Sequence, residues 1–483
     1  MTSQSLVHRL SIPTFALLAA TVSAYVATTP TGYIHKFLYL SIVLTFALVL
    51  RPELFIVCSV LAFAVSSVTS APVLAALPGP IYFPDAVVLL VAARGVFPRD
   101  RVPARSPLAG WPTVFFALWA LIMLIAAVRA MNAGVSFQSA IRGDLALIYW
   151  PLLYFGFVRA FRERGFDASI FWCGVAVVAI GLATWMFVAR MLGYEFHDSG
   201  LGEVPTGEDT FVRRNFGFAA AFILYPTLAL VGMAGMSHGG NRNWRWVLVA
   251  FVGTVATLTT LIRGEILGLV LGALVILWLR SRSQRTTARV RTAIQLGFAL
   301  VATIVALFAV SPTLGSAIVQ RVLPFTEQAA GAELNADYRR KAVETGFRVA
   351  NLHPAGLGVL DVTRLDAAGI DRGYLAHSGV ATLLLFAGWP ALVSALLAIV
   401  AIAWRSYVLP TAAPWIHPAF VGILIMLSVY SIGAAGLAGE PWVIPVGALA
   451  VAARFTLGLG RQGPVPQTWK RRPIADEPGS TRA

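Results

Sequence analysis

Charged residues are scarce in this sequence, and their scarcity decides its broad class. Only 12% of the 483 residues are Asp, Glu, Lys or Arg, whereas 58% are apolar. Soluble domains usually have about 25% charged residues, because polar side chains must cover their surface in water. The composition therefore excludes a disordered chain and a soluble enzyme, and it predicts an integral membrane protein.

Cysteine is also nearly absent, with Cys58 and Cys173 as the two examples in the chain. Both lie in long apolar runs, where a free cysteine packs as a small hydrophobic side chain. Two such cysteines, without metal-ligand spacing around them, exclude a disulfide framework and a cysteine-based metal site.

Apolar runs, in contrast, are abundant, and they predict the fold class. The hydrocarbon core of a bilayer is about 30 Å thick and needs roughly 20 mostly apolar residues per helix. We therefore expect an all-α, polytopic membrane protein with 12 to 14 transmembrane helices and one large extracytoplasmic loop that contains short helices. The candidate spans are 11–28, 35–50, 53–70, 82–97, 111–130, 143–160, 169–190, 214–235, 245–261, 263–280, 292–311, 379–404, 417–436 and 441–457.

The positive charges indicate how these helices are oriented. Segment 280–291 contains five arginines and no acidic residue, whereas segment 191–212 contains five acidic residues and no Lys or Arg. Because Lys and Arg accumulate in cytoplasmic loops, this pattern predicts that both termini are cytoplasmic. The net charge of +15 is thus mostly a topology signal. We expect membrane lipids and not nucleic acid as partners, since the basic residues are not interleaved with stacking aromatics.

Charge and hydropathy also divide the chain into four parts. Residues 1–311 hold helices 1 to 11, 312–377 form the extracytoplasmic loop, 378–458 hold the C-terminal helices, and 459–483 form a disordered cytoplasmic tail. Within the loop, residues 335–351 lack proline and predict a helix that ends before Pro354.

The informative polar residues lie at the expected outer ends of helices. Arg263 follows a short junction between two apolar runs, where its guanidinium suits a phosphate group; alternatively, it pairs with Glu265. Arg339 and Arg340 are adjacent on a predicted helix and point about 100° apart, so they cannot face one site equally. Alternatively, Arg340 pairs with Glu344 on a solvated helix face.

A histidine stands at the start of a later apolar run, where His377-Ser378 precedes 379–404. Imidazole suits general-base catalysis near neutral pH, and a nearby helix N-terminus favours its neutral form. Alternatively, His377 is a hydrogen-bonded residue of the membrane interface. We expect Ser378 to cap the helix, Pro390 to kink it, and 353–358 to form a structural turn. With Arg213 and Arg214, these features predict an outer-face pocket for a polyanion on a lipid carrier.

Three short motifs, in this order and spacing, resemble those of the O-antigen ligase and polymerase superfamily of bacterial envelope enzymes. The resemblance is strongest over residues 245–395. The motifs are Thr260-Leu261-Ile262-Arg263-Gly264, then Arg339 followed by the His-Pro turn 353–358, and finally His377-Ser378 followed by Gly388-Trp389-Pro390. The chain departs from the family pattern at Ile262, Val343, Ser378 and Phe386.

The resemblance implies a membrane glycosyltransferase on the outer face of a bacterial inner membrane. Such an enzyme moves a glycan, with inversion and without a metal or other cofactor, from a polyprenyl-pyrophosphate donor to an acceptor hydroxyl of a glycan, lipid or protein. By the same resemblance, His377 would deprotonate the acceptor, and arginines would bind the pyrophosphate. Those arginines are Arg263 and Arg339, with Arg213, Arg214 and Arg340 as further candidates.

Three alternatives stay open at this point. A repeat-unit polymerase of the same superfamily would extend another lipid-linked chain, a transporter would move a small anion or sugar, and a scaffold would only bind lipid-linked glycan. A transporter should place ionisable residues near the bilayer midplane, whereas here they lie at the outer ends of the spans. A lateral, lipid-open cavity lined by His377, Arg263 and Arg339 would favour the enzyme, whereas a central pathway that reaches both faces would favour the transporter.

Overall fold

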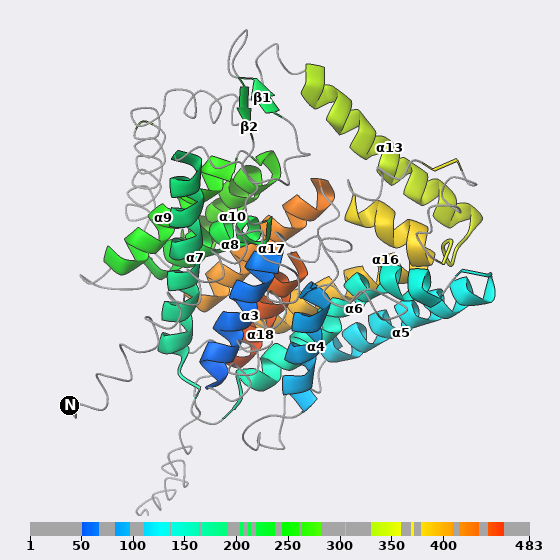
Figure 1. Ribbon diagram of the computed structural model, residues 1–483, viewed down its shortest axis with the longest axis horizontal. Helices are drawn as coiled ribbons and strands as arrows, with labels where there is room; N and C mark the ends of the chain where they lie inside the picture. The colour runs from blue at the N-terminus through cyan, green and yellow to red at the C-terminus, as the bar shows by residue number, and fades with distance from the viewer. Residues whose placement is uncertain are drawn as a thin grey trace, which may run out of the picture.

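The described part of the chain is helical apart from one short hairpin (Figure 1). The computed structural model describes residues 51–66, 83–96, 111–135, 137–163, 166–191, 203–205, 211–213, 219–236, 244–260, 262–281, 305, 330–358, 369–370, 378–408, 415–433 and 443–457. Its helices are α3 (Pro52–Ser66), α4 (Phe83–Val96), α5 (Trp111–Asn132), α6 (Phe137–Ala160), α7 (Ala168–Met191), α8 (Ala219–Met236), α9 (Trp244–Thr260), α10 (Arg263–Ser281), α13 (Ala330–Leu352), α16 (Gly379–Val408), α17 (Ile416–Gly433) and α18 (Val443–Leu457).

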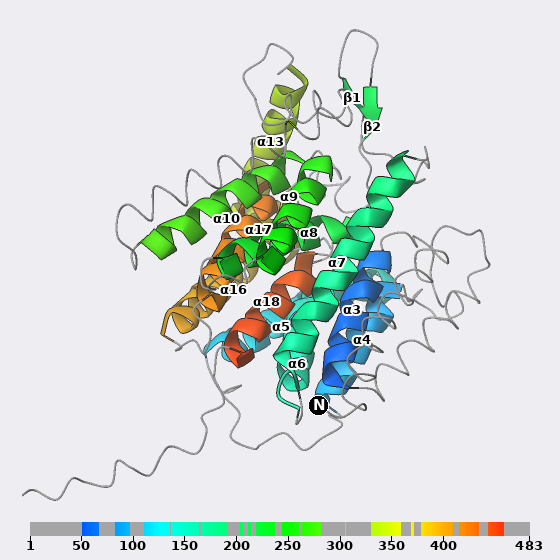
Figure 2. The same ribbon diagram turned by 90° about the vertical axis from the view of Figure 1, so that its left-hand side faces the viewer.

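The described residues depart from the expected all-α fold at one place, a short β-hairpin. Strand β1 (Glu203–Pro205) pairs antiparallel with β2 (Phe211–Arg213), and Val204 lies opposite Val212. Branched and aromatic side chains favour extended backbone, and the polar segment around them has no apolar run from which to build a helix. Figures 1 and 2 both show the hairpin and the N-terminal part of α13 beyond the same end of the helical bundle.

The predicted spans agree closely with the helices. Eleven of the fourteen coincide with α3 to α10 and α16 to α18, and their ends differ by at most six residues. The predicted loop helix 335–351 is also confirmed, as part of α13. The spans 11–28 and 35–50 lie outside the described residues, as does 292–311 apart from Val305.

Two of the described helices are long and apolar enough to cross a bilayer. They are the stretch Val114–Asn132 of α5 and the whole of α16, Gly379–Val408. Shorter apolar stretches, of 10 to 17 residues, lie in α3, α4, α7, α8, α9, α10 and α17. The predominantly helical fold is confirmed, whereas the polytopic membrane topology and the number of crossings stay predictions.

Small residues allow neighbouring helices to cross closely. A Cβ added to Gly232 of α8 would collide with the backbone of Ala250 in α9, and one added to Gly253 would collide with α8 in return. In the same way, a Cβ on Gly272 of α10 would lie 2.8 Å from the carbonyl oxygen of Gly422 in α17. Small residues at such crossings let backbones approach and gain van der Waals contact. These contacts fix α10 against α17, which matters for the site.

A buried ion pair joins the end of α4 to the turn after α6. Arg94 Nε donates to Glu163 Oε1 over 2.6 Å, and Arg94 Nη2 donates to Glu163 Oε2 over 2.5 Å. Both residues are almost inaccessible, and the guanidinium lies 5.3 Å from the centroid of the Phe55 ring. Two parallel charge-assisted hydrogen bonds offset the desolvation of the pair, which therefore fixes how these helix ends meet.

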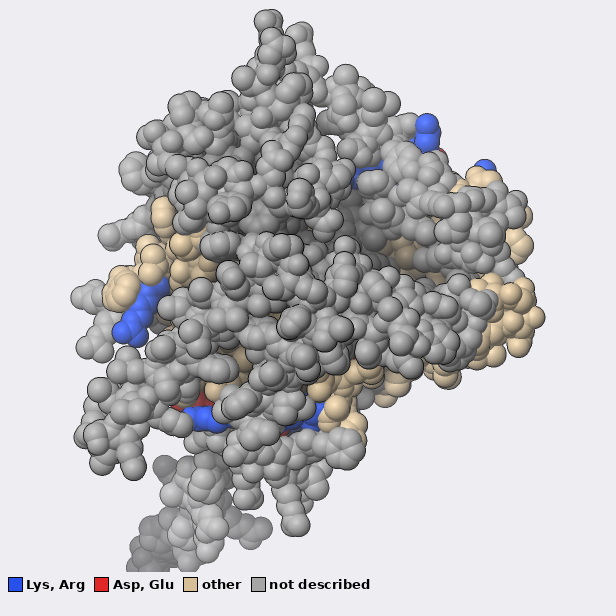
Figure 3. All heavy atoms as spheres, viewed as in Figure 1, with Lys and Arg blue, Asp and Glu red and all other residues tan. Residues whose placement is uncertain are grey.

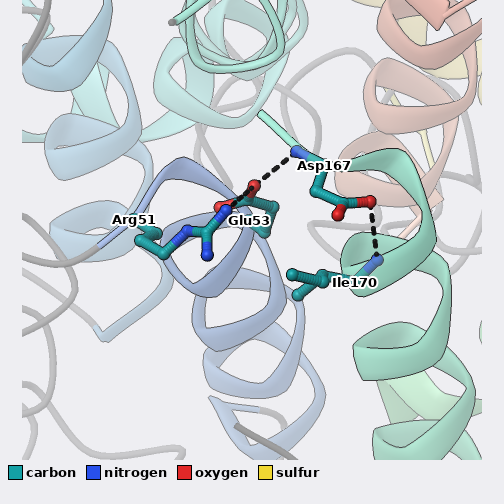
Figure 4. Close-up of polar contacts among 4 residues, drawn as sticks. All are labelled: Arg51, Glu53, Asp167 and Ile170. Carbon is teal, nitrogen blue, oxygen red and sulfur yellow. Dashed lines mark hydrogen bonds and ion pairs between the residues drawn. The ribbon is translucent and has the colours of Figure 1, made fainter. Parts of the chain in front are cut away.

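A second polar contact ties the start of α3 to the start of α7 (Figure 4). The carboxylate of Glu53 is fully buried and accepts from the backbone N–H of Asp167, and Arg51 Nη2 donates to it over 3.3 Å. Asp167 Oδ1 accepts from the N–H of Ile170 over 3.4 Å and so caps the first turn of α7. At the start of α7, the backbone N–H groups of Asp167 and Ile170 therefore donate to two carboxylates, those of Glu53 and Asp167, which are far apart in the sequence.

The Arg94–Glu163 pair gives a first testable prediction. Replacing Glu163 with glutamine should lower the free energy of unfolding by about 3 kcal/mol, because a buried guanidinium would lose its counter-charge. Replacing both partners, as Arg94→Met with Glu163→Leu, should restore most of the loss, since apolar groups need no partner. Thermal unfolding of the purified protein in detergent measures both. An equal loss in the single and double variants would contradict this account.

Candidate functional site

The helix that follows His377 begins at a serine cap. The N–H of Ala381 donates to Ser378 Oγ over 3.2 Å, and the N–H of Thr382 donates to the Ser378 carbonyl over 3.0 Å. Ser378 is fully buried. The predicted N-cap of α16 is therefore confirmed. His377, the residue before the cap, lies outside the described residues.

Helix α16 is sharply bent, as Pro390 predicts. Gly388 has φ 67° and ψ −151°, which is not helical, and Pro390 lacks the N–H that would continue the helical hydrogen bonds. The bend divides α16 into a first arm, 379–387, and a second arm, 389–408. Figure 1 shows the helix changing direction between the two arms. The bend leaves two carbonyl groups of the first arm, those of Leu385 and Phe386, without their usual helical donors.

The turn 353–358 supplies the missing partners. Because α13 ends at Leu352, just before the His-Pro pair, the chain is free to fold back onto α16. Three backbone hydrogen bonds result: Leu357 N–H to the Leu385 carbonyl over 2.8 Å, Gly358 N–H to the Phe386 carbonyl over 2.9 Å, and Trp389 N–H to the Pro354 carbonyl over 3.0 Å. Two motifs separated by some thirty residues in the sequence are thus one structural unit.

Two glycines make this close docking possible. Gly356 has φ 71°, and a Cβ on it would collide with the carbonyl of Phe386. A Cβ on Gly388 would collide with the carbonyl of Pro354. Arg129, at the end of α5, completes the unit by donating from Nη1 to the Ala355 carbonyl over 2.7 Å. Sequence reasoning missed Arg129, although an arginine closing an apolar run was a visible signal.

Helix α13 presents Arg339 and Arg340 on different faces. The face packed on α16 contains Ala342, Gly346 and Ala350, which recur at helical spacing, and a Cβ on Gly346 would lie 3.0 Å from the Cα of Ala381. Arg339 stands one turn before Ala342 on that same face. Arg340 is turned about 100° away from Arg339, and its Nε is 3.6 Å from Glu344 Oε1, with both side chains well exposed. The expected Arg340–Glu344 contact is confirmed.

The junction between α9 and α10 is held by a buried polar cluster. Thr260 Oγ1 donates to the carbonyl of Thr257 over 2.7 Å and lies 3.2 Å from Glu265 Oε2. The N–H of Ile262 donates to Thr260 Oγ1 over 3.3 Å. Thr260 and Glu265 are fully buried. These contacts make the junction short and fixed in shape, and α10 begins at Arg263, of which the backbone alone is described.

The last turns of α17 lie between this junction and the start of α16. A Cβ on Gly264, next to Arg263, would lie 3.6 Å from Cδ2 of Tyr430. Two and three residues earlier in α17, Ser428 and Leu427 line a cavity together with Gly379, the first residue of α16. The starts of α10 and α16 therefore flank the same end of α17.

That cavity is apolar and has a volume of about 320 Å³. It lies between α5, α6, α17, α18 and both arms of α16, with Gly379, Val380 and Leu383 from the first arm. From the second arm come Ala398 and Leu396, among others, and Leu396 is 52% exposed. The cavity therefore starts at the N-terminus of α16 and reaches the surface of the molecule beside the second arm.

The other predicted arginines are only partly described. Arg213 is the last residue of β2, where its Cα is paired with that of Glu203. Arg214 lies outside the described residues. No protein-family model matches the chain, and no curated protein shows significant sequence similarity to it. The proposed function therefore rests on the motif resemblance and on the geometry of the site.

Proposed function

We propose that this protein is a polytopic inner-membrane glycosyltransferase of the O-antigen ligase type. It transfers a glycan from a polyprenyl-pyrophosphate donor to an acceptor hydroxyl at the outer face of the membrane, with inversion and without a metal. One observation carries the proposal. The start of α10 at Arg263 and the start of α16, which follows His377 in the sequence, lie by one end of α17, at the head of an apolar cavity suited to a lipid-linked substrate.

The surface of the described helices supports a place in the bilayer. The apolar stretch of α5 is only 33% buried, and it exposes large side chains such as Val114, Leu121 and Leu124. A soluble protein rarely exposes a continuous apolar face of this kind. Figure 3 shows the described Lys and Arg side chains as a few separate groups on one face, much of which is formed by residues that are not described. A lipid environment accounts for the exposed apolar side chains of α5.

His377 is the proposed base. Its neighbour Ser378 caps α16, so His377 precedes the N-terminus of a helix, whose partial positive charge favours the neutral imidazole. A neutral imidazole accepts a proton from the acceptor hydroxyl as that oxygen attacks the anomeric carbon. The bond from the anomeric carbon to the pyrophosphate breaks, and the pyrophosphate departs with the bonding electrons.

Arg263 and Arg339 are proposed to bind the departing pyrophosphate. Helices in contact lie about 8–10 Å apart, so the axes of α10 and α16 on either side of α17 are at most roughly 20 Å apart, and long arginine side chains would have to reach inward to meet one pyrophosphate. Arg339 stands seven residues before Gly346, about 10 Å further along the helix axis, on the face that points beyond the start of α16. Guanidinium groups there would offset the charge that develops on the leaving group.

The additional arginines have weaker support. Arg213 and Arg214 belong to the hairpin region, which lies at the same end of the bundle as α13, so they are proposed to assist (Figure 2). Arg340 points away from α16 and pairs with Glu344, which favours Arg339 over Arg340 as the pyrophosphate ligand. A polymerase would use the same chemistry on single repeats. The apolar lining of the cavity gives no support to transport of a small anion or sugar.

The proposal is tested in cells that lack this protein. They should accumulate lipid-linked glycan, and wild type should relieve the accumulation. Arg339→Ala should fail to relieve it, because the leaving group loses a charge partner, whereas the matched control Arg348→Ala, on the exposed side of the same helix, should relieve it fully. Accumulated long chains would indicate a ligase, and accumulated single repeats a polymerase. No accumulation in the deletion would overturn the proposal.

A further inference from the structure

We propose that the end of the bundle opposite the proposed transfer site binds the phosphate group of an anionic phospholipid, held by Arg159, Arg162 and Arg405 where α6, α16 and α18 end. It is the end at which α7 begins, away from the hairpin (Figure 2). The inference goes beyond glycan transfer, because it concerns the other, cytoplasmic face of the proposed topology and needs only that the helices lie in a bilayer. Basic sites between helices on that face suit the negatively charged headgroups of membrane lipids.

A buried arginine joins the last turns of α16 and α18. Arg454 Nε donates to Ser406 Oγ over 3.0 Å, and Arg454 Nη2 donates to the Ser406 carbonyl. Ser406 Oγ also lies 3.4 Å from Nδ1 of His417, in the first turn of α17. Arg454 and Ser406 are both almost inaccessible. The ends of three helices are therefore fixed to one another here, and Arg405, the residue before Ser406, has a defined place beside them.

Two arginines at the end of α6 lie close to Arg405. Burial lowers the pKa of Arg162, which lies in the turn after α6, and the phenol of Tyr154 opposes this shift. The positive charges of Arg159 and Arg405 lower the pKa of Arg162 further, which requires the three guanidinium groups to be near one another. Guanidinium groups stay charged at neutral pH all the same. An anion placed among them offsets their repulsion and accepts charge-assisted hydrogen bonds.

Arg159 carries a hydrogen-bond donor that the described residues leave unsatisfied. Its Nε is buried and has no hydrogen-bond partner among them, and its guanidinium carbon lies 5.5 Å from the centroid of the Phe155 ring. Glu163, the nearest acidic residue along the chain, is bound to Arg94 through both carboxylate oxygens and does not serve Arg159. A buried donor without an acceptor is unfavourable, and a phosphate oxygen would supply the acceptor.

The end of α16 indicates the depth at which this cluster of arginines lies. Trp404 and Tyr407 are 67% and 77% exposed. Tryptophan and tyrosine are enriched at the headgroup level of a bilayer, where the ring meets hydrocarbon and its polar edge meets water. Arg405 is half-buried and is turned about 100° from Trp404 on the helix. It therefore stands between the exposed and the buried sides of α16, where a headgroup at the same depth can reach it.

The exposed side of α16 favours a lipid over a free phosphate. Val393, Leu397 and Val400 are exposed and continue the surface of Trp404 along the helix at helical spacing. A phosphate group at Arg405 would place the acyl chains of its lipid along this apolar stripe. Contact with the stripe removes apolar surface from water and adds to binding, whereas a free phosphate gains the charge contact alone.

Native mass spectrometry of the full-length protein in a neutral detergent measures how tightly one lipid is held. Phosphatidylglycerol should bind at least about tenfold more tightly than phosphatidylcholine, whose headgroup has no net charge. Arg162→Gln combined with Arg405→Gln should weaken phosphatidylglycerol by about tenfold or more and leave phosphatidylcholine unchanged. The matched control Arg245→Gln removes a charge at the start of α9, which packs on α7 and α8, and should change the affinity by less than about twofold because distant charges are screened.

Three results would overturn the inference. They are equal binding of the two lipids, an unchanged affinity for phosphatidylglycerol in the double variant, and displacement of the lipid by glycerol phosphate at an equal concentration, which would indicate a site for soluble phosphate. If the double variant does not fold, photoreactive phosphatidylglycerol in phosphatidylcholine nanodiscs is used on wild type. Labelling of the turn after α6 or of the last turns of α16 supports the site, and labelling elsewhere rejects it. These measurements do not involve glycan transfer, so the lipid site and the proposed function fail separately.

Discussion

Replacing His377 with alanine should lower glycan transfer by about 10²- to 10⁴-fold, because the acceptor hydroxyl would lose its general base. Binding of the lipid-linked donor should change little, since the imidazole acts on the acceptor and the arginines act on the pyrophosphate. Transfer is measured with purified protein in nanodiscs, from a defined lipid-linked glycan to its acceptor. Donor binding is measured in the same preparation.

A second histidine provides the control for this substitution. His353 is exposed and lies at the end of α13, where its backbone and not its side chain takes part in the turn, so His353→Ala should keep nearly full activity. Raising the pH should not rescue His377→Ala if imidazole is the base. Full transfer activity of His377→Ala at neutral pH would reject His377 as the general base.

Replacing Gly388 with alanine should lower the free energy of unfolding by roughly 4 kcal/mol. An L-residue at this φ and ψ, a backbone region that is essentially limited to glycine, costs about 1–3 kcal/mol. The added Cβ would also collide with the Pro354 carbonyl and displace the turn, which removes three backbone hydrogen bonds that contribute about 1 kcal/mol each. Because the turn fixes the first arm of α16, transfer activity should fall as well.

The matched control for Gly388→Ala is Gly181→Ala in the middle of α7. A Cβ there meets nothing within 4 Å, and its φ is not positive. Alanine is favoured over glycine inside a helix by roughly 0.5–1 kcal/mol, so this variant should be as stable as wild type or slightly more stable. Thermal unfolding in detergent compares the two. Similar stability of Gly388→Ala and wild type would show that the turn does not depend on the bend.

Local features of the site could be predicted because each depends on neighbouring residues. The end of α13 before Pro354, the bend near Pro390, and the Ser378 cap follow from the missing N–H of proline and from the hydrogen bond of a serine hydroxyl. The Arg340–Glu344 contact follows from helical spacing. The helix boundaries were predictable for the same reason, since long apolar runs bounded by polar segments have few other ways to fold.

Contacts between distant segments could not be predicted in this way. The sequence shows a His-Pro-Gly turn and a Gly-x-Pro bend, but no local rule says that the turn supplies the hydrogen-bond donors that the bend removes. Arg129 was overlooked because its acceptor, the Ala355 carbonyl, lies more than two hundred residues away. The Arg94–Glu163 pair also joins residues that no motif connects.

The sequence by itself determined that the chain is a bundle of apolar helices, where most of them begin and end, and which polar residues stand at their ends. Composition and periodicity act on each segment alone, so they suffice for these properties. The tertiary structure decided which helix ends meet: α10 and α16 at the end of α17, and Arg339 and not Arg340 on the face toward α16. It alone also decided that a cavity exists, because a void depends on how side chains from five helices fill space together.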